Sequence, residues 1–347
     1  MKNTQTVSAL VIAAVAALLS SSAFLFAHPS PRPQSPHEAP PATKPRLTLV
    51  QHSASREAPR HTPLALWHLL SLDAPSVAAV WTIAVASAVG LHLPWTSPAA
   101  MFVAVWMLYA ADRLLDARPL PGGQAPPELE ERHRFHHRHR RAFLLVIAIS
   151  ACVLVALLRS IDPHAMRLYT LLATLLGAWF LIIHARPLPG DGAHRLPKEL
   201  AVGIFFPAAV FIPTVARLPQ LRLDLLPIAV LLAATCSLNC LYLYAWEHPG
   251  PRTRAHWSTR WATYHLVALT WTVATLSLLL ILVSPLLDPS AQLHRGTTIL
   301  TSCILSSALL LLLLHHLRNR IAAVHLRALA DLVLLTPLIP LTFSLLV

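Results

Sequence analysis

The sequence predicts an all-α, polytopic membrane protein, a bundle of about nine transmembrane helices around a central cavity, preceded by an N-terminal hydrophobic segment. Two observations carry this prediction. The 347 residues are 55% hydrophobic and only 12% charged, and the mean hydropathy is +0.58, which does not fit a soluble domain. From about residue 65, apolar runs close to the roughly 20 residues needed to cross a bilayer recur at regular intervals.

The N-terminal part reads as two pieces before the bundle domain of residues 65–347. Residues 1–27 contain an apolar run that follows Lys2, and residues 28–64 are rich in Pro, Ser, His and Ala, which predicts a disordered linker. Cleavage after about Ala27, as in a signal peptide, would leave the linker outside and invert every later loop. We therefore expect an uncleaved extra span or a non-native extension, with a cleaved signal as the alternative.

The expected spans of the bundle follow in order, with boundaries uncertain by a few residues. Prolines 207, 213, 337 and 340 fall inside them and predict kinks, which a bundle around a cavity can absorb. The nine ranges are 73–92, 97–116, 142–159, 166–184, 199–216, 225–246, 262–284, 298–315 and 328–346.

Loop charges predict the orientation of these spans. The loops after the even-numbered spans, including the start of the last span, hold sixteen lysines and arginines, and the opposite loops hold five. Because positive loops stay in the cytoplasm, we expect the even-numbered ends to be cytoplasmic in a plasma (inner) membrane. The net charge of +12 then faces anionic membrane lipids. Aromatic residues lie within the apolar runs rather than among the basic residues, which argues against a nucleic-acid partner.

Asp112 and Asp116 are the first candidate site, at the end of the second span. Four residues apart, they share one face of a helix, about 5–6 Å between Cβ atoms. Two carboxylates at a membrane boundary are costly and repel each other unless a cation or a basic partner lies between them. They therefore predict a cation site or, alternatively, a helix-end charge cluster with Arg113 and Arg118.

Further polar residues gather at the other ends that are expected to be cytoplasmic. Carboxylates and an amide that face basic residues are what a magnesium diphosphate site needs, because Mg²⁺ takes oxygen ligands and Arg and Lys neutralise the diphosphate. Arg327 and Asp331 form an i,i+4 pair at the start of the last span that reads as a salt bridge. The remaining candidates are Arg186, Lys198, Asn239 and Glu247.

The stretch Tyr109-Ala-Ala-Asp-Arg-Leu-Leu-Asp116 resembles the tail of the first aspartate-rich motif of the UbiA superfamily of intramembrane aromatic prenyltransferases. The resemblance covers about residues 65–347 and implies nine spans with cytoplasmic motifs after the second and sixth. It implies that Asp112 and Asp116 hold one Mg²⁺ on a prenyl diphosphate, with Glu247 and Asn239 helping at a second. By the same resemblance Arg186, Lys198 and Arg113 contact the diphosphate, and a polyprenyl group passes to a hydrophobic or aromatic acceptor.

The chain departs from that family at two places. Leu108 and Tyr109 stand where the first motif has an Asn-Asp pair, and the second motif is reduced to Glu247 with Asn239. The alternative is therefore a non-catalytic or transport protein on the same bundle with a degenerate metal site. In that case Glu247 is a helix-end residue, Asn239 joins helices, and Lys198 is an interfacial cap.

Two other sets of residues are interpreted without a site. The run Arg132-His-Arg-Phe-His-His-Arg-His-Arg-Arg141 includes three histidines, His136, His137 and His139, that could bind a metal, but its arginines favour a solvated loop facing headgroups. The four cysteines at 152, 236, 240 and 303 lie in apolar runs without CxxC spacing, which predicts buried unpaired thiols.

Overall fold

The structure is a computed structural model that describes residues 62–116, 135–136, 138–185, 198–247, 256–287 and 291–346. The two N-terminal pieces expected at 1–27 and 28–64 lie outside this range apart from residues 62–64. Every regular element in the described ranges is a helix, so the all-α prediction is confirmed.

The helices begin and end close to the predicted spans. The predicted ranges fall on helices: most coincide with one long helix, and 262–284 and 328–346 each overlap two consecutive helices. The count of nine membrane spans is not confirmed by this agreement. The α-helices are α2 (Pro63–Leu69), α3 (Asp73–Ala88), α4 (Thr96–Asp116), α6 (Arg140–Leu158), α7 (Pro163–Ala185), α8 (Lys198–Arg217), α9 (Arg222–Glu247), α10 (Trp257–Tyr264), α11 (Leu266–Leu287), α12 (Ala291–Leu317), α13 (Ala323–Leu332) and α14 (Leu338–Leu346). Three 3₁₀ turns, Pro219–Leu221, Arg318–Arg320 and Val333–Leu335, link them.

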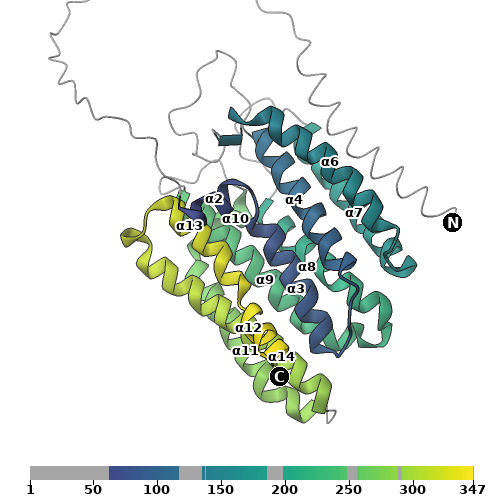
Figure 1. The fold of residues 1–347 in the computed structure, drawn as a ribbon. Coiled ribbons are helices and arrows are strands. Elements are labelled where there is room, and N and C mark those ends of the chain that lie inside the picture. Colours follow the sequence, from purple (N-terminus) through teal and green to yellow (C-terminus); the bar gives the residue numbers. More distant parts are fainter. Residues whose placement is uncertain are drawn as a thin grey trace, which may run out of the picture.

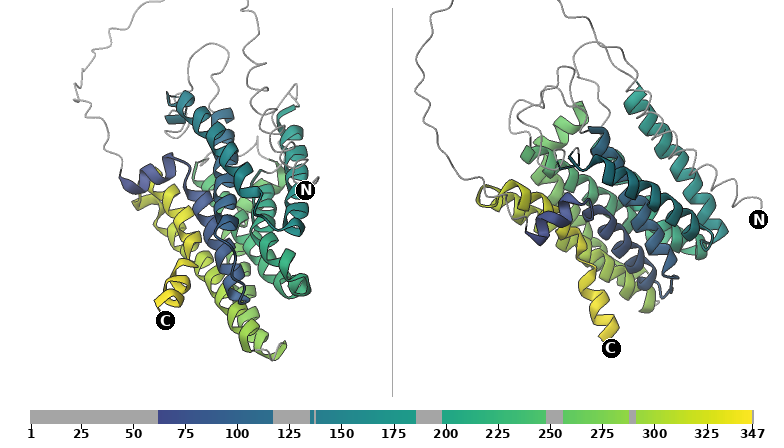
Figure 2. Two further views of the ribbon diagram at one scale, coloured as in Figure 1. Left: turned by 45° about the vertical axis from the view of Figure 1, so that its right-hand side comes forward. Right: turned by 45° about the horizontal axis from the view of Figure 1, so that its top comes forward.

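Five of the described helices are long and apolar enough to cross a membrane, or six if the bent pair of α2 and α3 counts as one span. They support a membrane protein by length and composition. Figure 1 shows the long helices running side by side, with α2 and α13 together at one end of the bundle. Figure 2 shows from two further sides that α6 and α7 form a flank away from the hairpin of α11 and α12.

The core joins α3, α8, α9, α11 and α12 through fully buried side chains such as Trp81 and Tyr242. Trp81 Nε1 donates to the Leu334 carbonyl at 2.8 Å, and the hydroxyls of Tyr242 and Thr270 lie 2.8 Å apart. These bonds satisfy the polar tips of aromatic residues that otherwise contribute apolar area.

Two glycines permit close contacts between helices. A Cβ at Gly203 would overlap the Ser237 hydroxyl of α9, and one at Gly296 would overlap the Ala88 carbonyl of α3. Small residues of this kind let helix backbones approach each other, which is how helices pack where no hydrophobic effect drives them together. The contacts fix α8 on α9 and α12 on α3.

The chain bends sharply where α2 meets α3, just before the first predicted span. The two helices differ in direction by 89°, and Ser71 between them has φ 60°, a left-handed conformation that non-glycine residues adopt at a cost. Ser71 is nevertheless fully buried. The bend brings residues from α2 beside the first turn of α3, which is where the candidate site forms.

Candidate functional site

A buried polar cluster lies at the end of the bundle that carries α2 and α13. It consists of six side chains from α2, α3, α4, α9, α13 and the α2–α3 break: His68, Ser71, Asp73, Arg113, Asn239 and Asp331. All but Asp331 are less than a tenth exposed, and the Asp331 side chain is 15% exposed. Such groups persist inside a membrane protein only when they are paired, so their pairing decides what the cluster can do.

Arg113 is the only arginine or lysine that the described ranges bury. Its Nη1 donates to the His68 carbonyl at 2.7 Å and to the Ser71 hydroxyl at 2.9 Å, and its Nη2 lies 3.2 Å from Asp73 Oδ2. The guanidinium thus holds the α2–α3 break and neutralises the Asp73 carboxylate. In this structure the predicted diphosphate contact of Arg113 is replaced by contacts within the protein.

The two carboxylates of the cluster meet at His68. His68 Nδ1 lies 2.7 Å from Asp73 Oδ2 and 3.8 Å from Asp331 Oδ2. Asp73 Oδ1 also accepts from the backbone N–H of Ala74 at 2.9 Å. One ligand atom from each of His68, Asp73 and Asp331 can be chosen so that all three lie within 4.8 Å of one another.

Asp331 joins α13 to α9. Asn239 Nδ2 donates to Asp331 Oδ1 at 2.9 Å, whereas the buried Oδ1 of Asn239 has no hydrogen-bond partner among the described residues. α13 is outside the helices identified as possible spans. Asn239 thus joins α9 to α13, which is the role given to it in the non-catalytic alternative. Its side-chain oxygen has no partner among the described residues.

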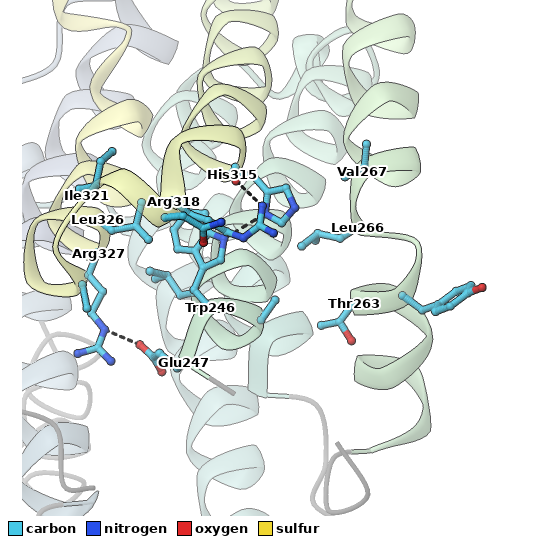
Figure 3. A pocket seen from close by; sticks show the side chains of 15 residues that line it. Trp246, Glu247, Thr263, Leu266, Val267, His315, Arg318, Ile321, Leu326 and Arg327 are labelled. Atoms are coloured by element: carbon cyan, nitrogen blue, oxygen red, sulfur yellow. Dashed lines mark hydrogen bonds and ion pairs between the residues drawn. The ribbon is translucent and has the colours of Figure 1, made fainter. Parts of the chain in front are cut away.

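A second polar region borders a cavity of about 520 Å³ at the ends of α9, α10, α11, α12 and α13. Glu247 lines the cavity, and its Oε1 lies 2.8 Å from Arg327 Nε, while Trp246 Nε1 donates to His315 Nδ1 at 3.1 Å. Figure 3 shows these pairs, with Arg318 on the same side as His315. The expected salt bridge between Arg327 and Asp331 is not the pairing that the structure shows. Arg327 pairs with Glu247 on α9, and Asp331 accepts a hydrogen bond from Asn239.

The other predicted site residues are described less fully. Asp112 is half-buried on α4, one residue before Arg113. Arg186, together with the side chains of Asp116 and Lys198, lies outside the described part of the chain. Tyr109 lies within electrostatic reach of Asp73, Arg113, Cys240 and Asp331. Tyr109 of α4 therefore lies near Cys240 of α9.

The histidines before α6 do not behave as a solvated loop throughout. His136 is fully buried, its Nε2 lies 3.1 Å from the Ser71 hydroxyl, and its ring stacks on Phe143 at 4.2 Å between centroids. His139 instead contacts the Phe135 carbonyl through Nδ1 at 3.0 Å. The expectation of a fully solvated run is wrong for His136, because the aromatic face of α6 covers it. Cys152, similarly, is exposed, which corrects the expectation that all four thiols are buried.

Three residues of the cluster, His68, Ser71 and Asp73, were not predicted as site residues. Asp331 was predicted only as the salt-bridge partner of Arg327. A signal was present for Asp73, which is an acid at the head of an apolar run and should mark a functional site by default. Nothing local marks Ser71, because its importance comes from the bend. Protein-family models, curated proteins and solved structures were all compared with the chain, and none of them matches it.

Proposed function

We propose that the protein is an integral membrane prenyltransferase that moves a polyprenyl group from its diphosphate to a lipid-soluble or aromatic acceptor, with Mg²⁺. The proposal includes nine spans and an active side that faces the cytoplasm. One observation carries it. Polar residues of α4 and α9, the second and sixth predicted spans, come together at the same end of the bundle: Tyr109 and Arg113 from α4 and Asn239 from α9.

The donor set on α4 fits magnesium. Asp112 and Asp116 offer only carboxylate oxygens, which is the ligand type that Mg²⁺ prefers. The amide oxygen of Asn239, which has no hydrogen-bond partner in the described part of the chain, is a further neutral donor on α9. When bound, the ion would neutralise the charge that develops on the leaving diphosphate. Glu247 fits a second ion less well, because Arg327 bonds its carboxylate at 2.8 Å. The proposal therefore rests on the α4 pair.

The remaining residues act by binding and by excluding water. The cavity beside Glu247 carries Arg318 and Arg327, whose charges suit a diphosphate. The apolar side chains of the bundle shield a reacting allylic cation from water until the acceptor attacks it.

A transport or non-catalytic function is the second candidate, and a specific observation favours it. Glu247 and Arg113, two of the residues assigned to catalysis or substrate binding, bond to other side chains of the protein. Carboxylates buried inside membrane bundles are also common on proton and ion pathways.

The test uses purified full-length protein with Mg²⁺ and labelled prenyl diphosphates of several lengths. Diphosphate release that requires Mg²⁺ supports the transferase, and Asp112→Asn and Asp116→Asn should each abolish it while the protein still folds. The exposed Asp224→Asn is the matched control. Absence of release from every prenyl diphosphate, or full activity in both variants, would contradict the proposal and favour the transport function.

A further inference from the structure

The buried polar cluster holds more carboxylates than permanent cations among the residues that the structure describes. Asp73 and Asp331 supply two carboxylates, and within the described ranges Arg113 is the one arginine or lysine that is buried with them, bonded to Asp73. Tyr109 and Cys236 also lie within electrostatic reach of Asp331, and neither is a cation. With both carboxylates ionised and His68 neutral, the described part of the cluster has one negative charge more than positive charges, which favours the binding of a further cation in a region of low dielectric constant.

We propose that His68, Asp73 and Asp331 bind one divalent transition-metal ion, with the Asn239 oxygen as a fourth ligand. Two ligands on one such ion, with bonds of about 2.0–2.2 Å, lie up to about 4.4 Å apart. His68 Nδ1 and Asp331 Oδ2, at 3.8 Å, are already within this range. The 2.7 Å contact of His68 Nδ1 with Asp73 Oδ2 opens when the ion takes the place of the proton between them.

The fourth donor is an independent observation. Asn239 is 4% exposed, its amide nitrogen is directed at Asp331, and its buried oxygen has no hydrogen-bond partner among the described residues. A buried acceptor is expected to have a partner, since nearly all such atoms are satisfied in native proteins, and a bound ion would supply one. Ser71, which accepts from Arg113, has a left-handed conformation of the strained kind that clusters at binding sites.

The donor types select the class of metal. An imidazole nitrogen with two carboxylates and an amide oxygen suits zinc, manganese, iron or cobalt, whereas magnesium and calcium prefer sites made of oxygen alone. Arg113 would then be an outer partner that orients the Asp73 carboxylate, as hydrogen-bonded groups around metal ligands do. This site shares only the Asn239 oxygen with the magnesium site of the proposed function. Its other ligands and its metal are different, and it does not depend on that function.

The test measures metal on the full chain without a histidine tag, in detergent. After chelation and dialysis, Co²⁺ and Zn²⁺ are titrated while bound metal and the visible absorption of Co²⁺ are recorded. His68→Gln and Asp331→Asn remove one ligand each, and the exposed His164→Gln and Asp224→Asn are matched controls. Every variant keeps the histidine-rich run before α6, so weak binding there cancels in the comparison.

We expect wild type and controls to bind one ion more than the ligand variants, or to bind it at least about tenfold more tightly. The intense visible absorption of four-coordinate Co²⁺ should be absent from both ligand variants. Zn²⁺ should displace Co²⁺, and a large excess of Mg²⁺ should not. Where Asp331→Asn fails to fold, the spectrum and competition in wild type still decide. Three results would overturn the proposal: equal binding in all variants, displacement of Co²⁺ by Mg²⁺, or no bound ion in wild type. The third result would show that the cluster is a closed ion-pair network.

Discussion

Replacement of Arg113 by methionine should destabilise the protein strongly, whatever the cluster binds. The substitution keeps much of the side-chain volume and removes the charge that pairs with Asp73, which is 1% exposed. Removing one partner of a buried ion pair typically costs about 3–5 kcal/mol, because the other charge stays buried without compensation. The His68 carbonyl and the Ser71 hydroxyl also lose their donor. We expect a loss of about 3–5 kcal/mol in the free energy of unfolding.

The measurement is unfolding in mixed micelles, arranged as a double-mutant cycle with Asp73→Asn. If the two side chains are coupled, the double variant should be at least about 1.5 kcal/mol more stable than the sum of the single effects requires. Arg167→Met on the exposed face of α7 is the matched control and should change stability by no more than about 0.5 kcal/mol. A loss below about 1 kcal/mol for Arg113→Met, or additive effects in the cycle, would refute the assignment of Arg113 as the compensating charge.

Three further predictions concern other parts of the bundle. Gly296→Ala should lower the free energy of unfolding by about 1–3 kcal/mol, because the added Cβ overlaps the neighbouring helix. Gly177→Ala is the control and should be neutral or slightly stabilising, because the space around Gly177 is open. Equal effects of the two substitutions would contradict the close contact at Gly296. Glu247→Gln should lower prenyl-transfer turnover by roughly tenfold or more if Glu247 assists the reaction, and unchanged turnover over a range of Mg²⁺ would exclude it from the mechanism. With the exposed native thiol first replaced, an impermeant reagent on intact cells should label Gln292→Cys and not Gln124→Cys, and the reverse pattern would invert the expected orientation.

The helices were predictable from the sequence because an apolar run of about 20 residues has few alternatives to a membrane helix. The predicted ranges fall on helices, although only five or six of the described helices are long and apolar enough to cross a membrane. The breaks were not predictable to the same degree. A sharp bend at Ser71, which has no proline or glycine beside it, adds α2 in front of the first predicted span, and the last predicted span is interrupted at Val333–Leu335. Such breaks depend on tertiary contacts, here those of Arg113 and Trp81.

The candidate site was predictable only in part, because it also depends on tertiary contacts. A single helix shows which residues share its face, so Asp112 and Asp116 were found together from their spacing. Spacing says nothing about partners on distant helices. The contacts of Arg113 with Asp73 and of Asn239 with Asp331 join residues 40 and 92 positions apart. The family resemblance predicted a diphosphate contact for Arg113, whereas in the structure its guanidinium contacts Asp73.

The distribution of the cluster over the chain has a consequence for folding. His68 comes from α2, Asp73 from α3, Arg113 from α4, Asn239 from α9 and Asp331 from α13, so the complete cluster forms only when all five helices are in place. An intermediate that contains only α2, α3 and α4 can already pair Asp73 with Arg113. Asp331 finds Asn239 and His68 only when α13 docks against α2 and α9. The cost of leaving Asp331 buried and unpaired therefore opposes alternative positions of α13, and the same side chains that form the site also specify the closure of the bundle.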